Sequence, residues 1–145
     1  MIRVENVSKS FGSKKALHQI SFEIQEGEIF GFLGPSGSGK TTMINVLTGQ
    51  LAADQGETVL LGKSSRNLTS NDLEQIGIVS DSSGFYEKMS LYKNLLIYAK
   101  LYGLKASRVD TVLDQVGLSD AKDIIAEKLS TGMKQRMFLA RALLN

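Results

Sequence analysis

Alternating apolar and polar positions near the start of the chain predict two β-strands. Ile2 and Val4 alternate with charged residues, and Ile20, Phe22 and Ile24 alternate with polar ones. A period of two residues is typical of a strand that buries one face and exposes the other.

Three later apolar runs also predict strands. Residues 29–33 are almost continuously apolar, which is typical of a strand covered on both faces within a parallel sheet. Residues 58–61 and 76–79 are shorter runs of the same kind. We therefore expect a mixed sheet whose central part lies in the interior.

A spacing of 3.6 residues between apolar positions predicts helices in the rest of the chain. The predicted helices cover residues 41–47, 91–102, 109–116 and 133–144. Gly103 and Gly117 would end the second and third, and Ser130 is placed to cap the start of the fourth. Strands first and helices last indicate an α/β protein with an antiparallel portion at its beginning.

Composition narrows the class of protein. The chain has 145 residues, a formal charge of +2 and no cysteine, which excludes a disulfide framework and a thiol nucleophile. No run of five basic residues occurs, so we expect no nucleic-acid partner. The N-terminus lacks the order of a signal peptide, and the longest apolar run, residues 29–34, is too short to cross a membrane.

Residues 34–41 match the phosphate-binding pattern G-x-x-x-x-G-K-[ST] at every fixed position. Glycines let backbone N–H groups surround phosphate oxygens, and the following helix adds its positive end. Lys40 can reach the β- and γ-phosphates, and the Thr41 hydroxyl can bind Mg²⁺. The alternative is a glycine-rich turn with an exposed lysine. The predicted nucleotide residues are Gly34, Pro35, Ser36, Gly37, Ser38, Gly39, Lys40, Thr41 and Thr42.

A second motif narrows the class of nucleotide-binding protein. Residues 129–136, L-S-T-G-M-K-Q-R, followed by L-A-R-A-L at 139–143, resemble the signature L-S-G-G-Q-x-Q-R…A-R-A-L of ATP-binding-cassette (ABC) ATPases. Ser10-Phe11-Gly12 resembles the aromatic loop of the same family. The resemblance implies a P-loop NTPase core of the α/β class, with an N-terminal antiparallel β portion, a C-terminal helical portion and an incomplete central sheet.

The resemblance also implies a division of labour along the chain. Residues 1–80 would be the β-rich nucleotide-binding part, and residues 81–145 would hold the coupling loop, the helices and the signature. Phe11 would stack on adenine, and its alternative reading is a buried strand residue. Ser130, Thr131, Gly132 and Met133 would face ATP held by a second protomer, although Ser130 could be only a helix cap.

The chain departs from the family pattern at three positions. Thr131 replaces a glycine and Met133 replaces a glutamine, a variant similar to drug- and bacteriocin-exporter ATPases. Asp81 stands where the family usually has glutamine. It could bind Mg²⁺ through a short carboxylate arm, or be a surface residue without a metal role. His18 lies too early to be the family's switch histidine and reads as a surface strand residue.

The implied function is that of an ATP-binding subunit of an exporter. ATP and Mg²⁺ would be its cofactors, and its partners would be a transmembrane permease subunit and a second ATPase protomer joined head to tail. Such a subunit is cytoplasmic and lies on the inner face of the membrane. The alternatives are a short regulatory module that binds nucleotide without hydrolysis, and a soluble ABC ATPase unconnected with transport.

In the family, the Mg²⁺-binding aspartate, the catalytic glutamate and the switch histidine follow the signature helix. We therefore expect the chain to be an N-terminal fragment with no catalytic residue of its own and no efficient hydrolysis alone. Strands that are missing from the central sheet would leave open edges. We accordingly expect a marginally stable monomer, or one that self-associates.

Overall fold

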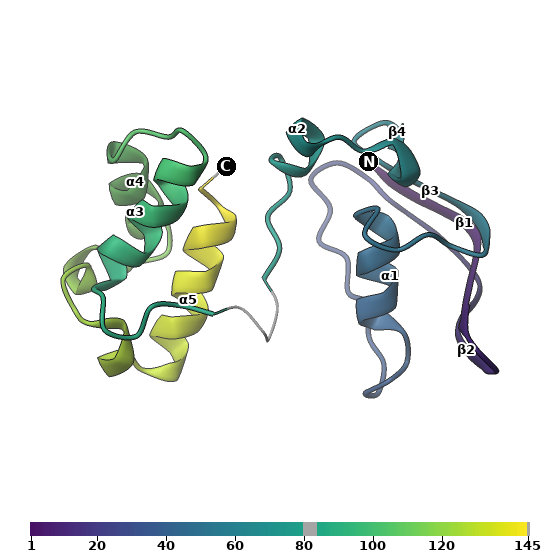
Figure 1. The fold of residues 1–145 in the computed structure, drawn as a ribbon, viewed down its shortest axis with the longest axis horizontal. Coiled ribbons are helices and arrows are strands. Elements are labelled where there is room, and N and C mark those ends of the chain that lie inside the picture. The colour runs from purple at the N-terminus through teal and green to yellow at the C-terminus, as the bar shows by residue number, and fades with distance from the viewer. Residues whose placement is uncertain (80–83, 145) are drawn as a thin grey trace. The chain divides into compact units, whose positions relative to one another are not determined.

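The computed structural model describes residues 1–79 and 84–144. It divides into two compact units, Met1–Leu73 and Glu74–Asn145 (Figure 1). The first unit contains the sheet and one long helix, and the second is helical.

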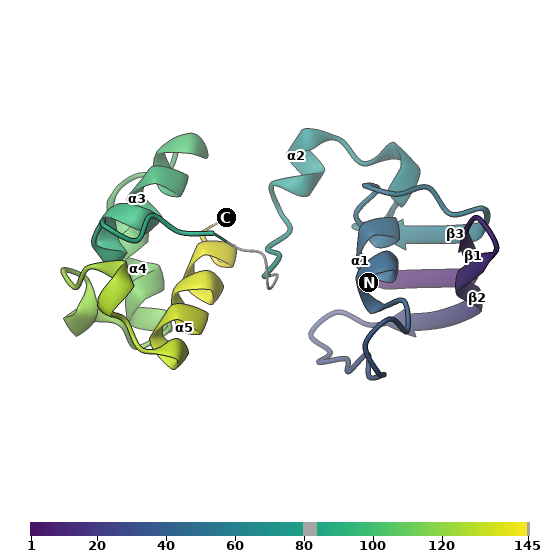
Figure 2. The ribbon, with the colours of Figure 1, turned by 60° about the horizontal axis from the view of Figure 1, so that its bottom comes forward.

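The sheet of the first unit is antiparallel throughout its described strands. It comprises β1 (Ile2–Phe11), β2 (Lys14–Ile24), β3 (Gln55–Leu60) and β4 (Lys63–Ser64), in the order β2-β1-β3-β4. Figure 2 shows β1 between β2 and β3. In register, Val4 pairs with Phe22 on one side and with Thr58 on the other. The strands predicted from alternation at the start of the chain and from residues 58–61 are confirmed.

One helix covers a face of this sheet. Helix α1 (Lys40–Leu47) buries Met43 and Val46 against Val4, Val7 and Leu17 of the first two strands. Figure 2 shows α1 lying across the strands. The chain returns to the sheet through β3, then passes through η1 (Ser65–Asn67) and the short helix α2 (Ser70–Leu73).

The run at residues 29–33 does not form the predicted strand. Ile29 is 99% exposed and Leu33 93%, while Phe30 and Phe32 keep partial cover by packing their rings on Phe22. A strand needs a neighbour for its N–H and C=O groups, and no described strand pairs with this run. The prediction of a buried strand here is therefore wrong for this structure.

The run at residues 76–79 also lies outside any strand. Ile78 and Val79 are both exposed. The reason is the same as for residues 29–33, because an apolar run forms a strand only where a neighbouring strand pairs with its backbone. As a consequence, the parallel part of the expected sheet does not form among the described residues.

The second unit is a three-helix cluster with two short 3₁₀ turns. It contains α3 (Leu91–Leu101), α4 (Ser107–Gln115), η2 (Ser119–Ala121), η3 (Ala126–Lys128) and α5 (Thr131–Ala142). Each long helix contacts the other two. Their common core is apolar and consists of Leu91, Leu95, Ala99, Val109, Val112, Leu113, Val116, Leu118, Ala121, Ala126, Leu129, Met137, Ala140 and Leu144.

The predicted helix ends in this unit are confirmed. Gly103 and Gly117 follow α3 and α4 with φ of 67° and 64°, a left-handed conformation that favours glycine. Within residues 1–79 and 84–144, no helix has the length and apolar content that a bilayer crossing requires.

Candidate nucleotide site

The phosphate loop, residues 34–41, leads directly into α1. Gly39 is the N-cap of that helix, with φ 94° and ψ 4°, and Lys40 is its first residue. The helix predicted after the glycines therefore begins where the motif requires it. The first N–H groups of any helix lack intrahelical partners, so this end can bind an anion.

Gly39 is required by space as well as by backbone conformation. A Cβ at this position would lie 2.4 Å from the carbonyl oxygen of Ala16 and 2.9 Å from Leu17 Cδ2. The start of α1 is thus pressed against β2. This contact fixes the direction in which the helix end points.

The ammonium group of Lys40 lies inside the curve of the loop. Its Nζ donates to the carbonyl oxygens of Gly34 and Pro35, each at 2.7 Å, and lies 3.4 Å from Ser38 Oγ. The Ser38 N–H donates to the Pro35 oxygen at 3.2 Å and closes the turn. A cation and a helix N-terminus therefore converge at one exposed loop, an arrangement that fits a phosphate group.

The remaining predicted loop residues are accessible. Ser36, Gly37 and Thr41 are exposed, and Thr42 is half-buried. No cluster of three or more His, Cys, Asp or Glu side chains that could hold a metal occurs in the described part of the chain. The exposed Thr41 hydroxyl is the predicted ligand of the loop for Mg²⁺, an ion that usually binds together with substrate phosphates.

Two sequence-based assignments concern Asp81 and His18. Asp81 lies outside the described residues, so its proposed contact with Mg²⁺ stays a prediction. His18 lies on β2 with an exposed side chain, as expected for a surface strand residue.

Phe11 is the last residue of β1 and is 52% exposed. This exposure contradicts the alternative reading of a buried strand residue. Nearby, Lys9 Nζ lies 5.8 Å from the ring centroid and pairs with Asp54 Oδ1 at 2.7 Å. The Lys9 ammonium and the Ser10 N–H lower the pKa of Asp54 below its usual value. These bonds fix the end of β1, from which Phe11 projects.

The signature segment, residues 129–136, forms the start of α5. Ser130 is the N-cap, and its Oγ accepts a hydrogen bond from the Met133 N–H at 3.3 Å, so the predicted cap is confirmed. Ser130, Thr131 and Gly132 are exposed, and the space around Gly132 is open. Met133 packs partly against the helical core. Its side chain therefore contributes to packing of the helical unit.

The arginines of the motif act as structural ties. Arg136 Nη1 donates to the carbonyl oxygens of Val116 and Gly117, at 3.0 and 2.9 Å, and so caps the C-terminus of α4. Arg141 Nη1 donates to the Gly84 carbonyl oxygen at 3.0 Å and to the Tyr98 hydroxyl at 3.1 Å. Both arginines of the signature motif therefore help to hold the helical unit together.

The structural role of Asn94 was hardly indicated by the sequence. Asn94 is buried in α3, where its Oδ1 accepts from the Tyr86 N–H at 2.7 Å and its Nδ2 donates to the Tyr86 and Ser90 carbonyl oxygens. It holds the preceding segment against the helix. The one sequence feature that could have indicated this role is the position of a polar residue between the apolar positions Leu91 and Leu95 of the helix.

Comparison with known proteins agrees with this geometry. Residues 17–145 match the family described as ABC transporter. The chain belongs to the ABC transporter family.

Curated relatives lie among transport proteins. The chain is 36% identical to the bacitracin transport ATP-binding protein BcrA of Bacillus licheniformis and 37% identical to the linearmycin resistance ATP-binding protein LnrL of Bacillus subtilis. Each match covers the whole chain and 48% of the relative. The lantibiotic transport ATP-binding protein SrtF of Streptococcus pyogenes is 30% identical, with 62% of its length covered. The chain thus spans about half the length of the first two relatives.

Solved structures give the same assignment. An ATP-binding cassette of an ABC transporter in its ADP conformation matches with a TM-score of 0.82 and 29% identity, over 99% of this chain and 64% of that one. A nucleotide-free cassette matches with a TM-score of 0.80, 31% identity and the same coverage. The predicted P-loop NTPase fold class is therefore confirmed.

Proposed function

We propose that this chain is part of an ATP-binding subunit that couples MgATP binding and hydrolysis to export through a separate membrane subunit. The observation that carries the proposal is the Lys40 ammonium, held within the curve of a glycine-rich loop at the start of α1. Membership of the ABC transporter family and the transport names of the relatives support it.

In this proposal the loop residues bind the phosphates of ATP. Residues 34–39 other than Pro35 offer backbone N–H groups, and the N-terminus of α1 adds its positive end. The Lys40 ammonium exchanges its carbonyl partners for β- and γ-phosphate oxygens. Mg²⁺, when bound, neutralises phosphate charge, with the Thr41 hydroxyl among its ligands. Phe11, exposed at the end of β1, stacks on the adenine ring.

The signature segment is proposed to bind ATP held by a second protomer. Ser130, Thr131 and Gly132 are exposed at the N-terminus of α5, and the open space at Gly132 permits a phosphate to approach the backbone. The Ser130 Oγ accepts one hydrogen bond as a cap, so its own O–H remains available to donate. Met133 would support this end of the helix by packing beneath it.

The proposal places the subunit at the cytoplasmic face of a membrane, beside its transmembrane partner. An exporter subunit differs from the two alternatives in one measurable property. Its ATPase rate should depend on the membrane subunit. A regulatory module would not hydrolyse ATP, and an ATPase unconnected with transport would ignore the membrane subunit.

The test uses the full-length protein reconstituted with its membrane subunit in liposomes. We expect hydrolysis that rises when the membrane subunit is present and falls at least about a hundredfold in Lys40→Met, since a charged donor to the phosphates is lost. Lys122→Met, an exposed lysine of the helical unit, is the matched control. An ATPase rate that is the same with and without the membrane subunit would overturn the transport assignment.

A further inference from the structure

A basic segment surrounds α3 in the helical unit. Between residues 88 and 109 the chain has five basic residues and neither aspartate nor glutamate, although its overall charge is only +2. The five are Lys88, Lys93, Lys100, Lys105 and Arg108. Positive charge is thus concentrated in one stretch of a chain that is otherwise nearly balanced.

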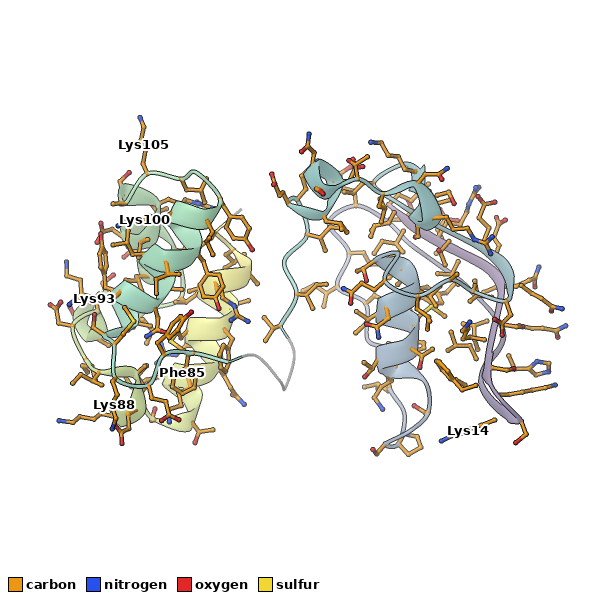
Figure 3. The ribbon with its side chains drawn as sticks, in the orientation of Figure 1. Lys14, Phe85, Lys88, Lys93, Lys100 and Lys105 are labelled. Carbon is orange, nitrogen blue, oxygen red and sulfur yellow. The ribbon has the colours of Figure 1, made fainter. Side chains whose placement is uncertain are left out.

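The lysines follow the length of one helix. Lys93 and Lys100 are seven residues apart on α3, so they project from almost the same side of the helix, about 10 Å apart along its axis. Lys105 follows shortly after the end of α3 at Leu101. Figure 3 shows the labelled lysines from Lys88 to Lys105 succeeding one another along this helix, with Lys105 extending away from the ribbon.

Three of these cations are available to an external partner. Lys88 pairs with Glu127 at 2.5 Å, which raises the pKa of the lysine, and Arg108 donates to the Leu143 and Leu144 carbonyl oxygens. Lys93, Lys100 and Lys105 are exposed, and none forms an ion pair among residues 1–79 and 84–144.

Acidic side chains that the structure describes near this segment form no ion pair with the three lysines, and this includes the exposed Asp123, whose neighbours Lys122 and Ile124 accept hydrogen bonds from the start of α3. Glu127 is held by Lys88, and Asp110 on α4 lies 3.9 Å from Lys122. Glu87 precedes the segment. The three available lysines therefore carry charge that no ion pair among the described residues neutralises.

Exposed apolar side chains accompany the free lysines. Leu101 is 74% exposed and Tyr102 is 43% exposed, directly after Lys100. Lysines beside exposed leucine and tyrosine are typical of helices at a lipid interface, where the apolar groups enter the headgroup region and the ammonium groups meet lipid phosphates.

We propose that the surface formed by Lys93, Lys100, Leu101, Tyr102 and Lys105 docks on an anionic lipid membrane. We name it the α3 basic surface. Lipid binding by this surface requires neither bound nucleotide nor the membrane subunit. The lipid-binding proposal can therefore be tested separately from the proposed function. The α3 basic surface would orient the subunit at the bilayer before and during assembly with a membrane partner.

Vesicle co-sedimentation of the full chain tests this proposal at about 0.1 M salt, where exposed charges act over about 10 Å. Vesicles of phosphatidylcholine alone are compared with equimolar phosphatidylcholine and phosphatidylglycerol. The charge variant is Lys93→Gln with Lys100→Gln. Its matched control, Lys14→Gln with Lys15→Gln, removes the same charge from exposed positions on β2. Leu101→Ser tests the apolar contact without changing charge.

We expect binding to the anionic vesicles only, weakened about tenfold or more by the α3 charge variant and several-fold by Leu101→Ser. The β2 control should bind nearly as well as the original chain, and circular dichroism should show that all variants keep their helices. Two results would overturn the proposal. One is an absence of binding to the anionic vesicles, whether or not poly-glutamate captures the chain, and the other is an equal loss of binding in the two charge variants.

Discussion

At the scale of single residues, Gly39 and Lys40 explain why the phosphate loop has its shape. Gly39 lets α1 start against the Ala16 carbonyl, and Lys40 then ties the loop's first carbonyls together. The motif predicted both residues, because its chemistry depends on short-range sequence. The contact between Gly39 and β2 could not be predicted, since it joins residues distant in the chain.

A pair of glycine substitutions separates backbone strain from steric conflict. Gly37 and Gly39 both have positive φ, of 80° and 94°, but only Gly39 has atoms within reach of a new Cβ. We expect Gly37→Ala to cost about 1 kcal/mol of stability and Gly39→Ala to cost clearly more, because it adds a clash with Ala16. Urea unfolding of the two variants measures the difference. Equal losses would show that Gly39 is not confined by β2.

At the scale of elements, the sequence pattern predicted those features that depend on neighbouring residues in the chain. The alternation in β1 and β2, the glycine stops after α3 and α4, and the Ser130 cap all agree with the structure. Residues 29–33 and 76–79 were expected to be strands and are not, because strand formation needs a neighbour that periodicity does not supply. The exposure of Phe11 likewise depends on how β1 ends, and its assigned role stays a prediction.

The short helix α2 is held by a capping arrangement that gives a pH prediction. Asp72 accepts from the Thr69 N–H and Oγ1 at 2.8 and 2.7 Å and pairs with Lys63 at 2.7 Å. The bond from Lys63, followed by those from Thr69, lowers the pKa of Asp72 to about 2. Since this folded-state pKa lies below the usual value, the stabilisation is complete above about pH 4 and is lost as the pH falls through 2.

Unfolding of Asp72→Asn and the original chain between pH 2 and 5 checks this assignment. We expect the variant to be less stable at pH 5 and to lose less stability on acidification. Glu26→Gln, in the exposed turn after β2, serves as the control. Parallel pH curves for Asp72→Asn and the original chain would show that the Lys63 contact does not depend on ionisation.

At the scale of the whole molecule, the described residues leave apolar side chains without cover. Ile29 and Leu33 are almost fully exposed in the first unit, and Ile78 and Val79 are exposed in the second. A soluble monomer rarely exposes such runs, which invite association with other chains. The expectation that the chain is a marginal monomer or self-associates stays a prediction.

Sedimentation equilibrium over a range of concentrations tests that expectation. We expect concentration-dependent association of the chain, reduced in Ile29→Ser with Leu33→Ser because the exposed run becomes polar. Leu101→Ser, which makes an exposed leucine at the end of α3 polar, is the matched control. A monomer with cooperative unfolding at every concentration would contradict the prediction.

The central claim is that Lys40 and its loop bind the phosphates of ATP. Isothermal titration of the chain with MgATP tests it most directly, with Lys40→Ala and the control Lys122→Ala, at an exposed lysine of the helical unit, measured alongside. The predicted result is binding by the original chain and the control, and affinity at least about tenfold weaker in Lys40→Ala, because a charged hydrogen-bond donor is removed. Equal affinity in all three proteins, or no MgATP binding by the original chain, would contradict the account.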